Sequence, residues 1–304
     1  MQPLKNPLPP SPPDYAHLLA RIDQLEGTVR EIRNLVGPFG TLFPDGTMLV
    51  QTIHGTKYFI DPNDEIMAPQ LVVYRQWEPD LSAFFVNSTT PDTVFIDVGA
   101  NFGYFTCLVA SRIGSKGSGQ VIAAEPNPAM QKLLRKNLRI NWSMSPVVVS
   151  ECAVAEQIGH LEFSIPVDRA ANASLTTATT HPTDARLIVK TTTLDQLSAN
   201  RVVDLIKIDV EGFETAVLRS GLDTIRRSAN VIIVIEWSQQ QMRDAGFTSD
   251  GLIETLKALE LRAYHLPASR FIDEQAWDTL EIPFETLRDV GYDNILLRRS
   301  RQAR

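Results

Sequence analysis

The stretch from Val94 to Tyr104 reads Val-Phe-Ile-Asp-Val-Gly-Ala-Asn-Phe-Gly-Tyr. A β-branched apolar run ends in an aspartate, two glycines follow, and an apolar segment continues to residue 110. This pattern predicts a strand, a tight turn and a helix. Glycine allows a sharp turn and lets a ligand approach bare peptide groups. Because the helix N-terminus offers free N–H groups and a positive dipole end, we expect a nucleotide-like ligand here.

The loop spacing differs from the dinucleotide fingerprint Gly-x-Gly-x-x-Gly. Asp97 precedes Gly99, and Asn101 stands where that fingerprint has its second glycine, ahead of Gly103. An aspartate would repel a pyrophosphate but suits an ammonium or a hydroxyl group. S-adenosylmethionine (SAM) carries both, an α-amino group and a ribose. We therefore expect SAM as the cofactor, with a plain strand-to-helix turn as the alternative.

A second acidic residue supports this expectation. The run Val121-Ile-Ala-Ala-Glu125 indicates the next buried strand, and Glu125 follows Asp97 by 28 residues. An acid at the end of the second strand can accept hydrogen bonds from both ribose hydroxyls. The alternative is that Glu125 caps a helix beginning near Pro128. The two motifs together favour the ribose role.

With these residues in view, the chain resembles the FkbM family of SAM-dependent methyltransferases. The similarity runs from about Trp77 to Trp237 and is carried by Ile96–Tyr104, Glu125–Asn127, Thr193–Asp195, Leu205-Ile-Lys-Ile-Asp-Val-Glu-Gly-Phe-Glu214 and Val217–Gly221. The resemblance implies a class I methyltransferase (Rossmann-like) fold and methyl transfer, usually to oxygen, on sugars or other small metabolites. We expect Glu78 to accept a hydrogen bond from the SAM amino group, since the family places an acid similarly; an ordinary acid at a helix start is equally consistent.

Charge and composition limit the choice of partners. The net charge is −7, and the one basic run is Arg298-Arg-Ser-Arg301, so a nucleic-acid substrate is not expected. No apolar stretch approaches the ~20 residues of a membrane span, and the N-terminus lacks the apolar core of a signal peptide. Two cysteines, Cys107 and Cys152, are expected to be buried thiols. These features predict a cytoplasmic enzyme that acts on a small-molecule or glycan acceptor.

The chain is expected to divide into four parts. Residues 1–13 hold six prolines and predict a disordered arm. Residues 14–36 predict an amphipathic helix with a heptad seam at Leu18, Ile22, Leu25, Val29, Ile32 and Val36. We expect this helix to form a homodimeric coiled coil; packing against its own domain is the alternative. Residues 37–90 form an N-terminal region with a small hairpin and a helix, and 91–300 form the SAM-dependent methyltransferase domain.

Alternating strands and helices from residue 91 predict a parallel, doubly wound α/β sheet. The expected strands are Val94–Val98, Val121–Ala124, Val147–Cys152, Leu205–Val210, Val231–Trp237, Arg262–Leu266 and Asn294–Arg298, and the expected helices lie near 103–113, 128–140, 214–220 and 249–260. Between the third and fourth strands, 160–165 and 186–192 suggest a hairpin. A Ser/Thr-rich run, 172–180, lies between them and is left unassigned.

Catalytic groups should lie at the carboxyl ends of these strands, where open α/β sheets bind ligands. We expect the adenine near Cys152 and Ala153, and catalytic acids at Asp209, Glu211 and Glu236. Methyl transfer needs in-line positioning and removal of a proton from the acceptor. Asp209 could be the base, could orient the sulfonium, or could bind Mg²⁺ together with Glu236, although two acids are few ligands for a metal.

Three further residues and two other function classes remain open. His181 and His265 are weaker candidate bases, and Lys207 is expected to pair with an acid. A nicotinamide-dependent oxidoreductase would need the second loop glycine and a Tyr-x-x-x-Lys motif. A non-catalytic SAM-binding scaffold would leave the acids at 97 and 125 without a purpose. We therefore favour a SAM-dependent O-methyltransferase.

Overall fold

The computed structural model describes residues 40–142, 145–165, 174–175 and 185–299, together with helical positions between Leu19 and Ile32. The chain forms two compact units, Met1–Phe39 and Gly40–Arg304. The proline-rich arm and both ends of the heptad seam, Leu18 and Val36, lie outside the described residues. Within the part of the chain that the structure describes, no helix is long and apolar enough to cross a membrane.

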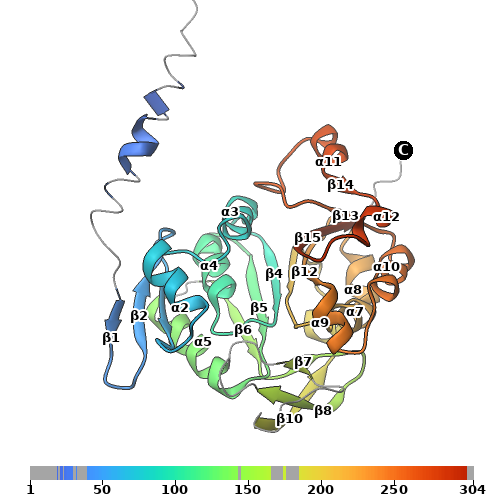
Figure 1. Ribbon diagram of the computed structural model, residues 1–304, viewed down its shortest axis with the longest axis horizontal. Coiled ribbons are helices and arrows are strands. Elements are labelled where there is room, and N and C mark those ends of the chain that lie inside the picture. The colour runs from blue at the N-terminus through green and yellow to red at the C-terminus, as the bar shows by residue number, and fades with distance from the viewer. Residues whose placement is uncertain are drawn as a thin grey trace, which may run out of the picture. The chain divides into compact units, whose positions relative to one another are not determined.

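An eight-stranded sheet with the order β14-β13-β15-β12-β11-β4-β5-β6 organises the larger unit (Figure 1). Its strands are β4 (Val94–Val98), β5 (Gln120–Ala124), β6 (Val147–Ser150), β11 (Leu205–Ile208), β12 (Ile232–Ser238), β13 (Leu261–Tyr264), β14 (Glu281–Ile282) and β15 (Tyr292–Arg299). The five strands from β6 to β12 in this order are parallel. This is the predicted Rossmann-like α/β fold.

The prediction of a wholly parallel sheet is wrong at the last strand. β15 runs antiparallel to both β12 and β13. After β13 the chain stays near the edge where β13 ends, because the next strand, β14, pairs with the end of β13. It does not cross back over the sheet. β15 therefore begins at the edge where the parallel strands end.

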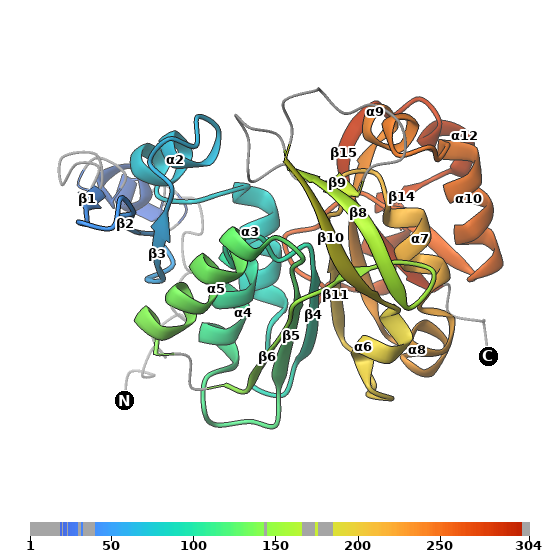
Figure 2. The same ribbon diagram turned by 90° about the horizontal axis from the view of Figure 1, so that it is seen from below.

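Helices cover both faces of this sheet (Figure 2). One face carries α3 (Pro79–Ser88), α4 (Tyr104–Ile113) and α5 (Pro128–Ile140), and the other carries α6 (Leu194–Ser198), α7 (Glu214–Arg219), α8 (Leu222–Arg227) and α10 (Ser249–Ala258). Strand side chains alternate between the two cores, as a pleated strand requires. Phe95 packs with α3 and α4, whereas Ile96 and Val98 pack with α7, α8 and α10. Asp97 and Lys207 share the side of Phe95.

A small antiparallel sheet precedes the main one. It consists of β1 (Gly40–Leu42), β2 (Met48–Gln51) and β3 (Lys57–Ile60), so the predicted hairpin is confirmed. Asn137 of α5 fixes β3: its Nδ2 donates to the Phe59 carbonyl at 3.1 Å, and its Oδ1 accepts from the Phe59 N–H at 2.6 Å. The short helix α2 (Met67–Pro69) and the π-helix η1 (Gln70–Tyr74) then lead to α3.

A third sheet confirms the predicted hairpin between the third and fourth strands. β8 (Gly159–Ile165) pairs antiparallel with β10 (Ala185–Thr192), and β9 (Ser174–Leu175) and β7 (Ala153–Val154) flank the pair. The predicted strand 147–152 is wrong at its end, because β6 stops at Ser150 and the chain changes sheets. β7 finds its hydrogen-bond partners in β10. The remaining helices are α9 (Gln239–Asp244), α11 (Glu274–Leu280) and α12 (Phe284–Leu287).

Candidate active site

The glycine loop is shaped by the end of the neighbouring strand. Gly99 has φ +77°, and a Cβ added there would lie 1.9 Å from the backbone carbonyl oxygen of Asp209. A side chain at this position would therefore displace either the loop or the end of β11. The sequence predicted glycine here for a sharp turn and for the approach of a ligand. In the structure the turn is present, and the group that approaches is the backbone carbonyl of Asp209, directly after β11. Gly103, the N-cap of α4, packs against Leu134 of α5.

Glu125 ties the glycine loop to the end of β5. One carboxylate oxygen accepts the Asn101 N–H at 2.7 Å and the other accepts the Asn127 N–H at 2.7 Å. The residue is 5% exposed, and burial raises its pKa to about 7. Glu125 is not among the described residues that line the cavity below, so its contact with the ribose stays a prediction. The cap of the helix after Glu125 comes from Asn127, whose side chain accepts the Ala129 N–H.

Asp97 lies beneath the loop. It is 1% exposed, and Thr106 of α4 donates its hydroxyl to Oδ2 at 2.5 Å. Its Oδ1 atom is buried without a partner in the described part of the chain. Burial raises the pKa of this carboxyl, and the nearby Lys207 ammonium opposes that shift. Asp97 does not line the cavity described below, so a direct contact with the cofactor stays a prediction.

A cavity of about 300 Å³ opens beside the loop at the carboxyl edge of the sheet. Three residues of the glycine loop, Gly99, Ala100 and Asn101, line it. One wall is apolar and aromatic: Ile66, Met67, Trp77, Phe102, Tyr104 and Phe105. The other wall is polar: Glu78, Asp209, Glu211, Glu236, Gln241 and Tyr292. The cavity therefore brings together the loop and every acid that the sequence assigned to strands four and five.

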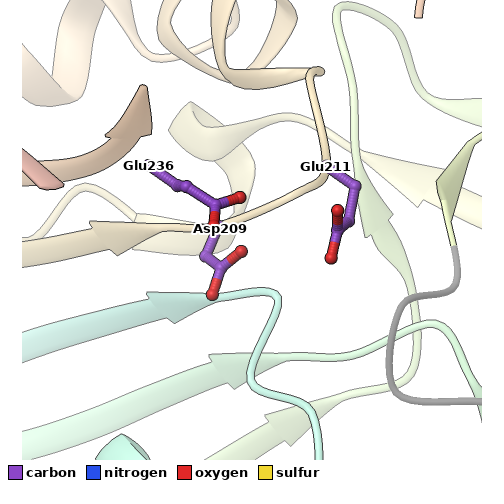
Figure 3. Close-up of side chains that lie close together, drawn as sticks. All are labelled: Asp209, Glu211 and Glu236. Carbon is purple, nitrogen blue, oxygen red and sulfur yellow. The ribbon is translucent and has the colours of Figure 1, made fainter. Parts of the chain in front are cut away.

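The catalytic candidates form a compact group (Figure 3). Carboxylate oxygens of Asp209, Glu211 and Glu236 lie within 4.8 Å of one another. Burial raises the pKa of Glu211 to about 8 and that of Glu236 to about 7, and the charge of Asp209 adds to both shifts. Lys207, with its side chain 6% exposed, donates to Asp209 Oδ2 at 2.8 Å, which confirms the predicted ion pair.

The turn after Asp209 is strained. Glu211 has φ +55°, and a Cβ on Gly212, at φ +102°, would lie 2.3 Å from the Gln241 carbonyl oxygen. Glu214 stabilises the turn because its Oε1 accepts the N–H groups of Val210 and Gly212 at 3.2 Å. Glu214 lies in the first turn of α7. Strain of this kind is typical of functional sites, and here it directs Glu211 toward the cavity.

Among polar residues, two that line the cavity and one that supports it were not predicted from the sequence, and neither was the apolar part of the lining. The Tyr292 hydroxyl donates to Glu236 Oε1 at 2.7 Å, and the Gln241 amide donates to Glu211 Oε2. Asn294 Nδ2 donates to Oε1 of Glu78, which lines the cavity with φ +40° just before α3. Tyr292 and Asn294 reach the site because β15 is antiparallel and starts at this edge. A parallel last strand would have placed them at the opposite edge.

Other sequence candidates lie apart from the cavity lining. Cys152 and Ala153 are buried just beyond the end of β6, so their contact with the adenine stays a prediction. Both cysteines are buried and free, as expected. His265 is not among the described residues that line the cavity, and His181 lies outside the described residues.

A Rossmann-like sheet with a glycine loop and an acid-lined cavity at its carboxyl edge is the arrangement expected of a class I methyltransferase. The chain belongs to the FkbM methyltransferase family, because the model of the methyltransferase FkbM domain matches residues 97–266, more than half of the chain.

One curated relative and two solved structures place the chain among other proteins. The hexuronic acid methyltransferase AglP of Haloferax volcanii is 28% identical over 160 residues, which cover 52% of this chain and 61% of AglP. The structure of TYW2 from M. jannaschii with AdoMet has a TM-score of 0.39 and 12% identity, covering 85% of this chain and 86% of that one. A precorrin-6y C5,15-methyltransferase from Geobacter metallireducens has a TM-score of 0.38 and 12% identity, covering 72% and 86%. These scores are low, and the assignment rests on the family match.

Proposed function

We propose that this protein is a SAM-dependent O-methyltransferase that acts on a hydroxyl group of a sugar, a glycan or a related small metabolite. The observation that carries the proposal is the cavity, which joins the glycine loop to three clustered carboxylates. Family membership supports methyl transfer, and the name of the AglP relative supports a sugar acceptor.

The cofactor assignment follows from the charge of the cavity. Glu125, at the end of β5 beside the loop, and Glu78, in the cavity lining, are the acceptors that we assign to the ribose hydroxyls and the amino group, and the polar part of the lining is acidic. The sulfonium and ammonium of SAM are cations, and carboxylates stabilise them. The pyrophosphate of a nicotinamide cofactor would instead meet repulsion from the same side chains. SAM therefore fits this cavity better than NAD.

Two of the three acids suit different parts of one displacement. The acceptor oxygen attacks the methyl carbon, the carbon–sulfur bond breaks, and its electron pair stays on sulfur as S-adenosylhomocysteine forms. The acceptor proton must go to a base. Asp209, paired with Lys207 at 2.8 Å, is the acid that we assign to stabilising the sulfonium. Glu236, with a pKa raised to about 7 and a buried free Oε2, is the base that we favour.

The same three carboxylates have a spacing that could hold a divalent cation. The oxygen donors suit Mg²⁺, and Glu236 Oε2 has no other partner in the described chain. Lys207 already occupies Asp209 Oδ2. A bound cation would lower the pKa of the acceptor hydroxyl. Turnover that survives dialysis against a chelator would remove this role.

Calorimetry with SAM and with NAD tests the assignment. We expect micromolar binding of SAM and no measurable binding of NAD. Incubation with methyl-labelled SAM and a glycan or metabolite extract should then give a product that gains one methyl group on oxygen. Binding of NAD without binding of SAM would contradict the proposal.

A further inference from the structure

The polar end of the cavity has hydrogen-bond acceptors left over. Glu236 Oε1 is occupied by the Tyr292 hydroxyl, and Gln241 uses its amide N–H on Glu211. Two atoms remain buried without a partner in the described residues: Glu236 Oε2 and Gln241 Oε1. Gln241 Oε1 is an acceptor, and Glu236 Oε2 is one when its carboxyl is ionised, above the pKa of about 7. A buried acceptor without a donor is destabilising. A ligand that presents O–H or N–H donors would remove this cost.

The charge of the cavity lining also disfavours an anionic ligand. Four carboxylates line it, from Glu78, Asp209, Glu211 and Glu236, and Lys207 is the one cation among the described lining residues. That ammonium is buried and paired with Asp209 at 2.8 Å. Its remaining surface faces the ring of Phe105, 5.2 Å away. An anionic group that enters would meet carboxylates and find no unpaired cation in the described lining.

From these two observations we infer that the acceptor end of the cavity selects hydrogen-bond donors and rejects negative charge. The molecule that accepts the methyl group is a polyol or an amino polyol, neutral or cationic, and not a uronic acid. This differs from the substrate that the name of the AglP relative indicates. The inference rests on the proposed function, because it assumes that the methyl acceptor binds in this cavity beside the methyl group of SAM.

Three pyranoses that share one ring and differ in charge test the selectivity: glucosamine, glucose and glucuronic acid. Each is titrated into the full chain saturated with S-adenosylhomocysteine, and binding is followed by saturation-transfer NMR. Glucosamine and glucose should bind at millimolar concentration, and glucuronic acid should bind roughly tenfold more weakly or less. Equal or tighter binding of glucuronic acid would overturn the inference, as would no binding of the other two at tens of millimolar.

Isosteric variants locate the source of the selectivity. The double variant Glu211→Gln, Glu236→Gln should lose several-fold of the discrimination against glucuronic acid, while Glu254→Gln, an exposed site that pairs with Lys257, should keep it. Unchanged discrimination in the double variant would overturn the inference, as would a glucosamine preference that requires added Mg²⁺. Failure to bind S-adenosylhomocysteine would instead contradict the proposed function.

Discussion

Glu125 fixes the glycine loop, because its two carboxylate oxygens accept the Asn101 and Asn127 N–H groups. The sequence left open whether this residue binds the ribose or caps the helix that begins near Pro128. The cap of α5 comes from Asn127 instead. Ribose binding by Glu125 stays a proposal, and it is compatible with the hold on the loop because a carboxylate accepts more than two hydrogen bonds.

Replacing Glu125 with Ala should weaken SAM binding by about 1–3 kcal/mol, because the ribose and two loop N–H groups lose their acceptor. Calorimetry measures the affinity. Glu125→Gln, which keeps the size and one acceptor oxygen, should lose less. Glu254→Ala, at an exposed helix position, is the control and should leave affinity unchanged. Wild-type affinity in Glu125→Ala would sink the cofactor role of this residue.

Asp209→Asn should retain SAM binding and lose most turnover, because the isostere keeps the shape and removes the charge. It should also destabilise the fold by about 1–3 kcal/mol, since Lys207 stays buried without its closest counter-ion. The double variant Lys207→Met, Asp209→Asn should recover stability and not activity. Denaturant unfolding and a turnover assay separate the two effects. Wild-type turnover in Asp209→Asn would make the residue purely structural.

Stability should fall as the pH rises from about 5 to about 8. The pKa values of Glu125, Glu211, Glu214 and Glu236 are raised by burial to about 7, 8, 8 and 7, above the ~4.3 of an unfolded glutamate. The folded state therefore binds more protons in this window, and its advantage is lost as these groups ionise. Thermal melts across the window should show a falling Tm, with a smaller slope in Glu211→Gln. A Tm that climbs throughout would contradict the shifts.

At the scale of elements, local patterns predicted most of what the structure shows. Periodicity, turn residues and caps within a few positions of one another predicted three of its parts: the glycine loop, the hairpin of β8 and β10, and the helix 128–140. Long-range pairing was not predictable in this way. β15 has the same apolar composition whichever way it runs, and its direction depends on the path of residues 265–291. Tyr292 and Asn294 were therefore missed.

Tyr292→Phe tests what β15 contributes. Removing the hydroxyl leaves Glu236 Oε1 without its donor and frees the carboxylate to rotate. We expect turnover to fall at least several-fold with SAM affinity unchanged, because the ring is kept. Tyr74→Phe, at an exposed position on η1, is the matched control. Equal turnover in both variants would show that Glu236 does not depend on Tyr292.

At the scale of the whole molecule, the N-terminal helix presents an apolar seam. Ile22, Leu25, Val29 and Ile32 are between 48% and 64% exposed. In a parallel pair, β-branched residues at a and mostly leucine at d favour two strands, and Arg21 would face Glu26 of the second copy. The seam spans fewer than three heptads and includes Gly27, so the helix alone would be marginal. The homodimer thus stays a prediction.

Deleting residues 1–36 should shift the mass measured by light scattering from dimer toward monomer and leave SAM binding intact. Both follow if the seam joins two copies and the cofactor site lies wholly within residues 40–299. The single variant Leu25→Asp, which puts a charge into the seam, should act similarly, while Gln24→Asp, next to it on the helix, should not. A full-length chain that is monomeric at micromolar concentration would refute the coiled coil.

The antiparallel strand β15 also has a consequence for how the protein is made. It lies between β12 and β13, yet it leaves the ribosome after both. Until residues 292–299 emerge, β13 has no neighbour through which to join the sheet, and Glu236 lacks its tyrosine partner. β15 must therefore insert between two strands that precede it in the sequence. This pairing is non-local, and non-local pairing slows folding. The acidic pocket is therefore complete only after residues 292–299 have emerged and paired with β12 and β13.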